Sequence, residues 1–123
     1  TIGVIGNGAG LTMSTLDLIE YYNGRAANFL DVGGGADQER VTHAVRLVAS
    51  MPGISVIVVN LLGGITRCDE VAKGIIAAGV APTVIVRMAG TNEEEGRRLL
   101  AECGYRMLES MDAAVKAAME VAS

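Results

Sequence analysis

The sequence predicts an α/β fold of three layers, in which a doubly wound parallel sheet is covered by helices on both faces. Short apolar runs that end in Gly or Asn alternate with longer amphipathic stretches, which is the order of strands and helices around a parallel sheet. The apolar residues are mostly aliphatic, with one Phe and three Tyr in 123 residues, as a sheet buried on both faces requires.

The first elements follow this alternation. Residues 2–6 form an apolar strand, and residues 11–22 carry apolar side chains at mixed helical spacing. Asn23 and Gly24 then end this helix, because both residues tolerate the left-handed backbone of a helix C-terminus. Residues 28–32 are predicted to be the second strand.

The middle of the chain contains the strongest strand pattern. Asp37 is a suitable N-cap for a helix that ends before residues 51–53, which read Met-Pro-Gly. Residues 54–59 are almost all β-branched and apolar, which is typical of a central parallel strand. A helix from about residue 67 to residue 78 follows.

The last part repeats the pattern with shorter elements. Residues 82–87 and 105–108 are predicted to be the fourth and fifth strands. Two helices complete the chain. The first covers residues 93–102 and has Thr91 or Asn92 as its predicted N-cap, and the second covers residues 111–122 and begins after Ser110. This order predicts one flavodoxin-like domain over residues 1–123 with strand order 2-1-3-4-5, and a Rossmann-type order is the alternative.

Composition excludes several classes of function. The net charge of −4 and the absence of a basic stripe argue against nucleic acid and anionic membranes as partners. No apolar run reaches the roughly 20 residues that span a bilayer, and no signal peptide is visible. Cys68 and Cys103 match no metal spacing and indicate reduced thiols. Thr1 in place of an initiator Met suggests a processed or excised chain.

Ligands of such sheets bind at the carboxyl ends of the strands, where this sequence concentrates glycine and polar residues. The best candidate is the loop of Gly63, Gly64, Ile65 and Thr66 before the third helix. Glycine lets a backbone N–H approach an oxyanion closely, and the start of a helix favours an anion, so a phosphate or a carboxylate is the expected ligand. For Arg67, the sequence supports two interpretations equally: an anion ligand and a surface residue.

Other ligand patterns are incomplete. Residues 6–10 read G-N-G-A-G, without the full G-x-G-x-x-G of a dinucleotide site, and no G-K-[ST] is present. A receiver domain needs acidic residues at the ends of strands 1 and 3, where this chain has Asn7 and Asn60. Flavin binding is disfavoured because almost no aromatic side chains are available for stacking.

Single reactive residues have structural explanations. His43 lies in the middle of a predicted helix, away from the carboxyl edge, and is expected to be exposed or half-buried. Cys68 lies in the first turn of a helix, which favours a thiolate, but a packed and inert thiol is the preferred interpretation. Asp69 and Glu70 in the same turn complement the helix dipole.

Three segments resemble the β subunits of succinyl-CoA synthetases. Residues 7–13 read N-G-A-G-L-T-M, residues 27–36 read A-N-F-L-D-V-G-G-G-A, and residues 60–69 read N-L-L-G-G-I-T-R-C-D. They occur in the family's order and spacing, and the resemblance weakens after about Val80. It covers the last third of a family β subunit, so the chain resembles a carboxy-terminal CoA-ligase domain without the ATP-grasp domain.

The resemblance implies an activity and a set of site residues. The family joins a dicarboxylic acid to CoA at the expense of a nucleoside triphosphate, through a phosphohistidine carried by the α subunit. By position, Asn7, Gly64, Ile65 and Thr66 should contact succinate, and Gly63, Gly64 and Arg67 should form the phosphate loop. The resemblance implies no catalytic residue and no metal ligand in this chain, which alone should be inactive.

The same resemblance implies that ATP or GTP, Mg²⁺ and CoA bind outside this domain. It implies an α-subunit partner, docked on an exposed apolar face that also favours weak self-association, and a location in the cytoplasm or the mitochondrial matrix. Thr66 stands where the family often has Val, so a related acid, as in malate–CoA ligases or citrate-cleaving enzymes, is an alternative. The second alternative function is a stand-alone flavodoxin-like module that binds anions.

Overall fold

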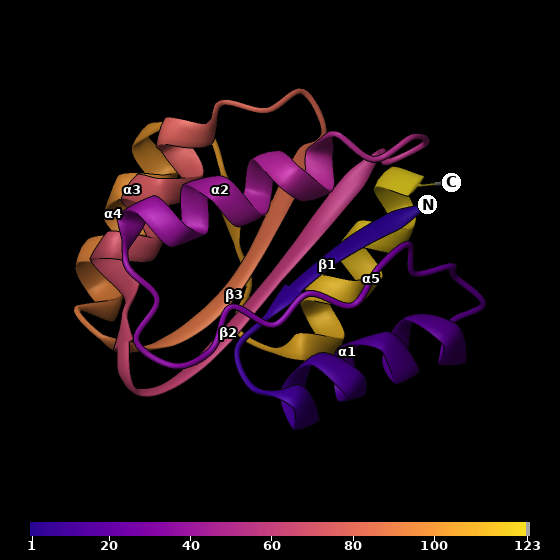
Figure 1. Ribbon diagram of the computed structural model, residues 1–123, viewed down its shortest axis with the longest axis horizontal. Helices are drawn as coiled ribbons and strands as arrows, with labels where there is room; N and C mark the ends of the chain where they lie inside the picture. The colour runs from indigo at the N-terminus through magenta and orange to yellow at the C-terminus, as the bar shows by residue number, and fades with distance from the viewer. Residues whose placement is uncertain (123) are drawn as a thin grey trace.

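A parallel sheet lies between two layers of helices in the computed structural model, which describes residues 1–63 and 65–122 (Figure 1). Over these residues the sheet has four strands in the order β1-β2-β3-β4, all parallel. The strands are β1 (Ile2–Gly6), β2 (Val56–Arg67), β3 (Thr83–Thr91) and β4 (Arg106–Met107). The predicted three-layer, doubly wound α/β class is confirmed.

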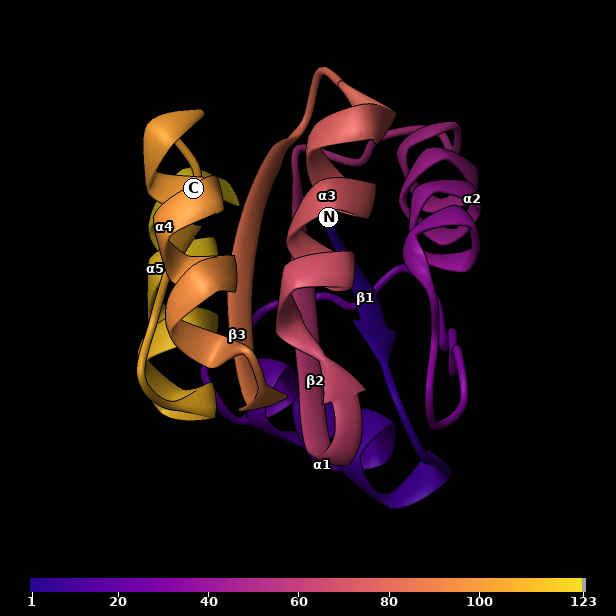
Figure 2. The same cartoon turned by 90° about the vertical axis from the view of Figure 1, so that its left-hand side faces the viewer.

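Helices cover both faces of the sheet. One layer contains α2 (Gln38–Ala49), α3 (Cys68–Ala78) and α4 (Glu93–Glu102), which Figure 2 shows side by side in front of the strands. The opposite layer contains α1 (Ala9–Tyr21) and α5 (Met111–Ala122). The helical stretch predicted from residue 11 therefore begins two residues earlier, and the two predicted helices at 93–102 and 111–122 have the observed bounds.

Strand β2 is central, as its β-branched sequence predicts. Ile57 and Val59 are fully buried under α2 and α3, whereas Val56 and Val58 are fully buried on the face of α1 and α5. A strand with apolar side chains on both faces must be covered on both, and this requirement fixes the three-layer arrangement.

The predicted second strand is not a regular strand. Residues 26–31 run along the outer edge of β1 and bridge it only at Ala26 and Asp31. Between these bridges the amide of Asn28 takes the place of the backbone, since its Oδ1 accepts from the N–H of Val4 at 2.9 Å and its Nδ2 donates to the carbonyl of Val4 at 2.8 Å. This segment still occupies the position of strand 2 in the predicted order 2-1-3-4-5.

The helix ends largely follow the predicted caps. Asp37 accepts from the N–H of Arg40 at 2.9 Å, and Ser110 accepts from the N–H of Ala113 at 3.1 Å. Asn23, with φ 64°, follows the end of α1 as predicted. Asn92 stands before α4 but makes no capping bond: its backbone is left-handed, with φ 58°, where a capping residue is extended, and its Nδ2 donates to Asp69. Among the described helices, none has both the length and the apolar character that crossing a membrane requires.

Candidate functional site

The candidate site lies at the carboxyl edge of the sheet, where three loops meet. Asn7 follows β1, residues 31–35 follow the segment beside β1, and residues 63–66 lie within the last part of β2. The structure brings Asn7 and Thr66 together, and their contact with succinate stays a prediction of the resemblance. Hydrogen bonds between side chains and backbone join the three loops into one unit.

Asn7 connects β1 to the end of β2. Its Nδ2 donates to the carbonyl of Leu62 at 2.8 Å and to the hydroxyl of Thr66 at 3.1 Å. Its Oδ1 accepts from the N–H of Leu62 at 2.9 Å. The amide therefore uses both of its donor hydrogens and one acceptor position on a single segment of β2.

Asp31 connects the β1–α1 turn to the second loop. Its Oδ1 accepts from the N–H of Gly8 at 2.7 Å and from the N–H of Gly33 at 2.8 Å, and these bonds lower the pKa of the exposed carboxyl. Gly8 and Gly33 have φ of 93° and 75°, a backbone that L side chains rarely adopt. The carboxylate thus holds in place two turns whose backbone glycine adopts without strain.

Replacing Asp31 with Asn is expected to remove a pH-dependent part of the folding stability. Because the folded-state pKa lies below the ordinary value of 3.8, the ionised carboxylate stabilises the folded chain above that pH, and this contribution is lost as the pH falls through the lowered pKa. The free energies of unfolding in urea of the parent and Asp31→Asn chains should therefore differ by a constant amount from pH 7 to about pH 5 and converge only as the pH falls below the ordinary value of 3.8.

Asp17→Asn, on the exposed side of α1, is the matched control for loss of one carboxylate. A gap between the parent and Asp31→Asn chains that stays constant as the pH falls well below 3.8 would contradict the expectation.

The expected loop at residues 63–66 is a wide bulge of β2. Leu62 pairs with Ala89 and Arg67 pairs with Thr91, so four residues of β2 oppose Gly90 alone. A Cβ at Gly90 would lie 2.5 Å from the carbonyl oxygen of Thr66 and 2.7 Å from that of Gly63. Because Gly90 has no Cβ, β3 can pack directly against the backbone of the bulge at this position.

Ile65 lies at the exposed top of the bulge, with 70% of its surface accessible. Its Cδ1 lies 2.9 Å from the position that a Cβ on Gly34 would take and 3.9 Å from that on Gly35, so these two glycines make room for this side chain. Thr66, in contrast, is 4% exposed. Gly64 lies outside the described residues, and its predicted part in the site stays a prediction.

The start of α3 carries charge of both signs. Arg67 has a side chain 60% exposed and lies 3.8 Å from the carboxylate of Asp69. Burial raises the pKa of Asp69, but the hydrogen bonds from Asn92 and the N–H of Glu70, together with the charge of Arg67, outweigh burial and hold it below its ordinary value. A negative charge thus already lies at the helix start where an anion is predicted.

Cys68, beside this charge, is the packed thiol that the sequence favours. It is fully buried, and burial, with the charges of Glu93 and Asp69, raises its pKa to about 11. A thiol with so little thiolate at neutral pH is a poor nucleophile.

A buried polar chain crosses the other face of the sheet at the same edge. Arg87 Nη1 donates to Asn60 Oδ1 at 3.1 Å, Asn60 Nδ2 donates to Thr15 Oγ1 at 3.0 Å, and Thr15 donates to the carbonyl of Leu11 at 2.8 Å. Asn60 and Thr15 are fully buried. Asn60 therefore joins α1, β2 and β3 and has a structural role.

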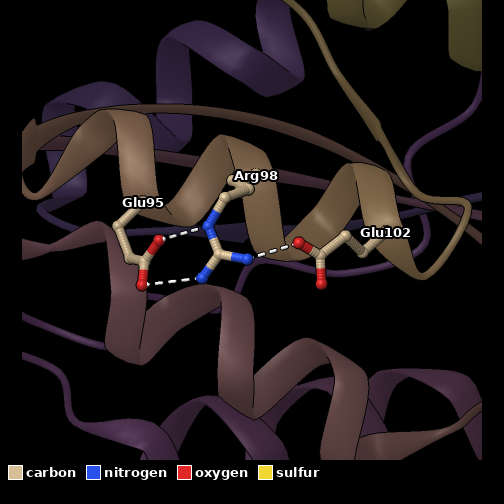
Figure 3. Close-up of polar contacts among 3 residues, drawn as sticks. All are labelled: Glu95, Arg98 and Glu102. Carbon is tan, nitrogen blue, oxygen red and sulfur yellow. Dashed lines mark hydrogen bonds and ion pairs between the residues drawn. The ribbon is translucent and has the colours of Figure 1, made fainter.

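Of the other charged groups, Arg40 lies at this edge, where its Nη1 donates to the carbonyl of Val32 at 3.3 Å. His43 is exposed on α2, as predicted. On the outer face of α4, Arg98 pairs with Glu95 and Glu102 of the same helix (Figure 3). Such exposed pairs contribute little stability. Within the described part of the chain, no three His, Cys, Asp or Glu side chains gather as a metal site would require.

Sequence reasoning misses two parts of this unit. In the sequence, Gly90 is only one of several glycines at strand ends, and Asp31 is only the polar residue near the end of the predicted strand at residues 28–32. The positions 31 and 33 do form a local Asx-type turn, which the D-x-G spacing could have indicated. The contact of Gly90 with residues 63 and 66 has no local signal, because it joins separate strands.

Comparison with known proteins gives the same family as the three sequence segments indicate. Residues 5–121 match the protein family described as CoA-ligase. The chain is 54% identical, over 98% of its length, to the β subunit of succinate–CoA ligase (ADP-forming) from Staphylothermus marinus. It is 58% identical, over 93% of its length, to that of Desulfurococcus amylolyticus. It spans about a third of these relatives, 33% and 31% respectively.

Solved structures share the fold at low identity. ATP citrate lyase from Methanothrix soehngenii, bound to citrate and coenzyme A, matches 97% of this chain and 38% of that chain with a TM-score of 0.77 and 20% identity. The dinucleotide-forming acetyl-coenzyme A synthetase 1 of Candidatus Korarchaeum cryptofilum, with phosphate and ADP, matches 98% of this chain and 32% of that chain with a TM-score of 0.79 and 19% identity.

Proposed function

The chain belongs to the CoA-ligase family, and from this premise we propose that it is the carboxy-terminal domain of the β subunit of an ADP-forming succinate–CoA ligase. The observation that carries the proposal is the identity of 54% and 58% to two such β subunits over nearly the whole chain. The coverage of about a third of those proteins fits one domain of a longer subunit, with residues 1–123 as that domain.

The proposed acid site is the bulge of β2 together with Asn7. Ile65 and the backbone around Gly64 would face the dicarboxylic acid, with Thr66 beneath them, and Gly63 and Arg67 would lie toward the phosphoryl group. A preformed bulge supports this role, because fixed backbone donors stabilise developing negative charge without having to reorganise. The domain would act by positioning, while the histidine that carries the phosphoryl group would come from the α subunit.

An α-subunit partner is supported by the surface near the site. Large apolar side chains are exposed on the elements that form this edge: Met13 at 48%, Leu62 at 42% and Ile65 at 70%. Exposed apolar side chains that gather beside a candidate site are typical of an interface. We propose that the α subunit covers this edge and completes the site.

Nucleotide, Mg²⁺ and CoA would bind mainly outside this domain. The carboxylates at the edge do not fit a metal, because Asp31 is bonded to two backbone N–H groups and Asp69 to Asn92. Hard cations need several free oxygen ligands together. ADP as the product follows the names of the relatives, and succinate is preferred to other acids for the same reason.

The test combines this chain with the α subunit of the Staphylothermus marinus ligase. Gel filtration should show a mixed complex, and succinate and inorganic phosphate should shift the backbone amide signals of Gly63 and of residues 65–67 in the complex. Malate and citrate, titrated in parallel, test the related acids. No complex, and no shift at about tens of millimolar ligand, would refute the proposal, whereas shifts of this chain alone without any complex would favour a stand-alone anion-binding module.

A further inference from the structure

Arg87 differs in its surroundings from the other arginines among the described residues. Arg87 and Arg97 are half-buried and the rest are exposed, and Arg97 pairs with Glu109 at 2.6 Å. Arg87, in contrast, makes one hydrogen bond, to Asn60, and no ion pair with any described residue. Since a guanidinium that is partly withdrawn from water ordinarily has a carboxylate beside it, the charge of Arg87 is left without a counter-charge in the described part of this chain.

The guanidinium of Arg87 is held in a fixed position at the carboxyl edge of the sheet. Gly6, the last residue of β1, pairs with Asn60, and Asn60 pairs with Arg87, so Arg87 lies at the level where β1 ends. Asn60 accepts from Arg87 at 3.1 Å and donates to Thr15 at 3.0 Å, and both of these anchoring residues are fully buried. Such an anchor orients the guanidinium before a partner arrives, which lowers the entropy that a contact would cost.

The free donors of Arg87 reach the surface of the molecule. Its Nη1 bonds to Asn60, which leaves Nε and Nη2 without a partner. Among the described residues no fully buried side-chain nitrogen lacks a partner, so these two nitrogens are accessible to solvent. Leu62, which is 42% exposed, lies two residues beyond Asn60 and therefore on the same face of β2. An unpaired positive charge and an exposed apolar side chain thus share this side of the edge.

We propose that Arg87 binds a carboxylate side chain of the α subunit when that subunit covers the edge. This inference rests on the proposed function, which supplies the partner, and it names the chemical group that the partner presents. A carboxylate can bond to Nε and Nη2 of one guanidinium at the same time. Arg67 is less suited to this role, because its side chain is 60% exposed and already lies 3.8 Å from the carboxylate of Asp69.

The first experiment measures the affinity of this chain for the α subunit of the Staphylothermus marinus ligase by calorimetry, at low and at high salt. Arg87→Gln, which has no charge but can still donate to Asn60, should raise the Kd at least about tenfold. The Kd of the parent chain should rise more steeply with salt than that of Arg87→Gln, because the variant lacks one ion pair. Arg98→Gln, which removes a positive charge from the outer face of α4, is the control and should bind like the parent.

The second experiment observes the guanidinium itself and needs no substitution. The Nε–H signal of Arg87 in the parent chain should shift when the α subunit is added, and its hydrogen should exchange at least about tenfold more slowly. The Nε–H of Arg98, which is already bonded to Glu95, is the internal reference and should not change. This measurement decides the question also if Arg87→Gln does not fold.

Three results would overturn the inference. The first is an equal Kd for the parent and Arg87→Gln chains, and the second is an Nε–H signal of Arg87 that the α subunit leaves unchanged. The third is a saturable shift of that signal by inorganic phosphate or acetate in this chain alone, with no loss of α-subunit affinity in Arg87→Gln, since Arg87 would then bind a small anion. A parent chain that does not bind the α subunit would refute the proposed function and the inference with it, whereas a bound parent and an equally bound variant would refute the inference alone.

Discussion

Replacing Gly90 with alanine is expected to lower the free energy of unfolding by about 1–3 kcal/mol and to displace the bulge of β2. The new Cβ would lie 2.5 Å from the carbonyl oxygen of Thr66 and 2.7 Å from that of Gly63. Both are backbone atoms on either side of the bulge, so neither can move aside as the end of a side chain could. Urea unfolding gives the loss of stability, and amide spectra of residues 65–67 report the displacement.

Gly10→Ala is the matched control. Nothing lies within 4 Å of a Cβ at Gly10, which is in the first turn of α1 with an ordinary backbone. The same substitution there should leave stability unchanged or raise it by up to about 1 kcal/mol, because alanine favours a helix. Equal effects at positions 10 and 90 would show that the close contact under the bulge is not a constraint.

Replacing Gly74 with alanine is expected to cost about 1–3 kcal/mol, although alanine is normally the better helix former. Gly74 lies inside α3 where this helix approaches the start of α2. A Cβ there would lie 2.7 Å from the carbonyl oxygen of Gln38 and 2.8 Å from Cβ of Val41. Urea unfolding of Gly74→Ala against the Gly10→Ala control measures the cost.

A second observation marks the same contact between α2 and α3. The hydroxyl of Thr42 lies 2.9 Å from the carbonyl oxygens of both Gln38 and Gly74. Gly74→Ala should therefore also weaken this bridge, and Thr42→Val should cost less than Gly74→Ala because it creates no clash. A stabilised Gly74→Ala chain would mean that the two helices can separate freely.

The fold class could be predicted because its signals are local. The β-branched run at residues 54–59 shows a strand covered on both faces, and the flanking amphipathic stretches supply the cover. Cap residues such as Asp37 and Ser110 mark helix starts with their own side chains. The family could also be inferred from three short segments of sequence, and the match over residues 5–121 confirms it.

Boundaries that depend on distant contacts could not be predicted. Residues 28–32 have the composition of a strand, yet the amide of Asn28 bonds to Val4 where backbone pairing would otherwise occur. Asn92 has the preferred residue type for a cap, yet it caps nothing: its backbone is left-handed and its side chain donates to Asp69 of another helix. In both places a polar side chain bonds to a tertiary partner in place of the local one that propensity assumes.

By itself, the sequence determined the order of elements, the central strand and the stretch of chain that contains the candidate site. Tertiary structure alone decided that residues 63–66 are a bulge of β2 and not a free loop. This bulge exists because Asn7 bonds to both of its ends and Gly90 leaves space beneath it, and these residues are far apart in the chain. Periodicity and propensity describe neighbours in sequence, whereas hydrogen bonds and close contacts join neighbours in space.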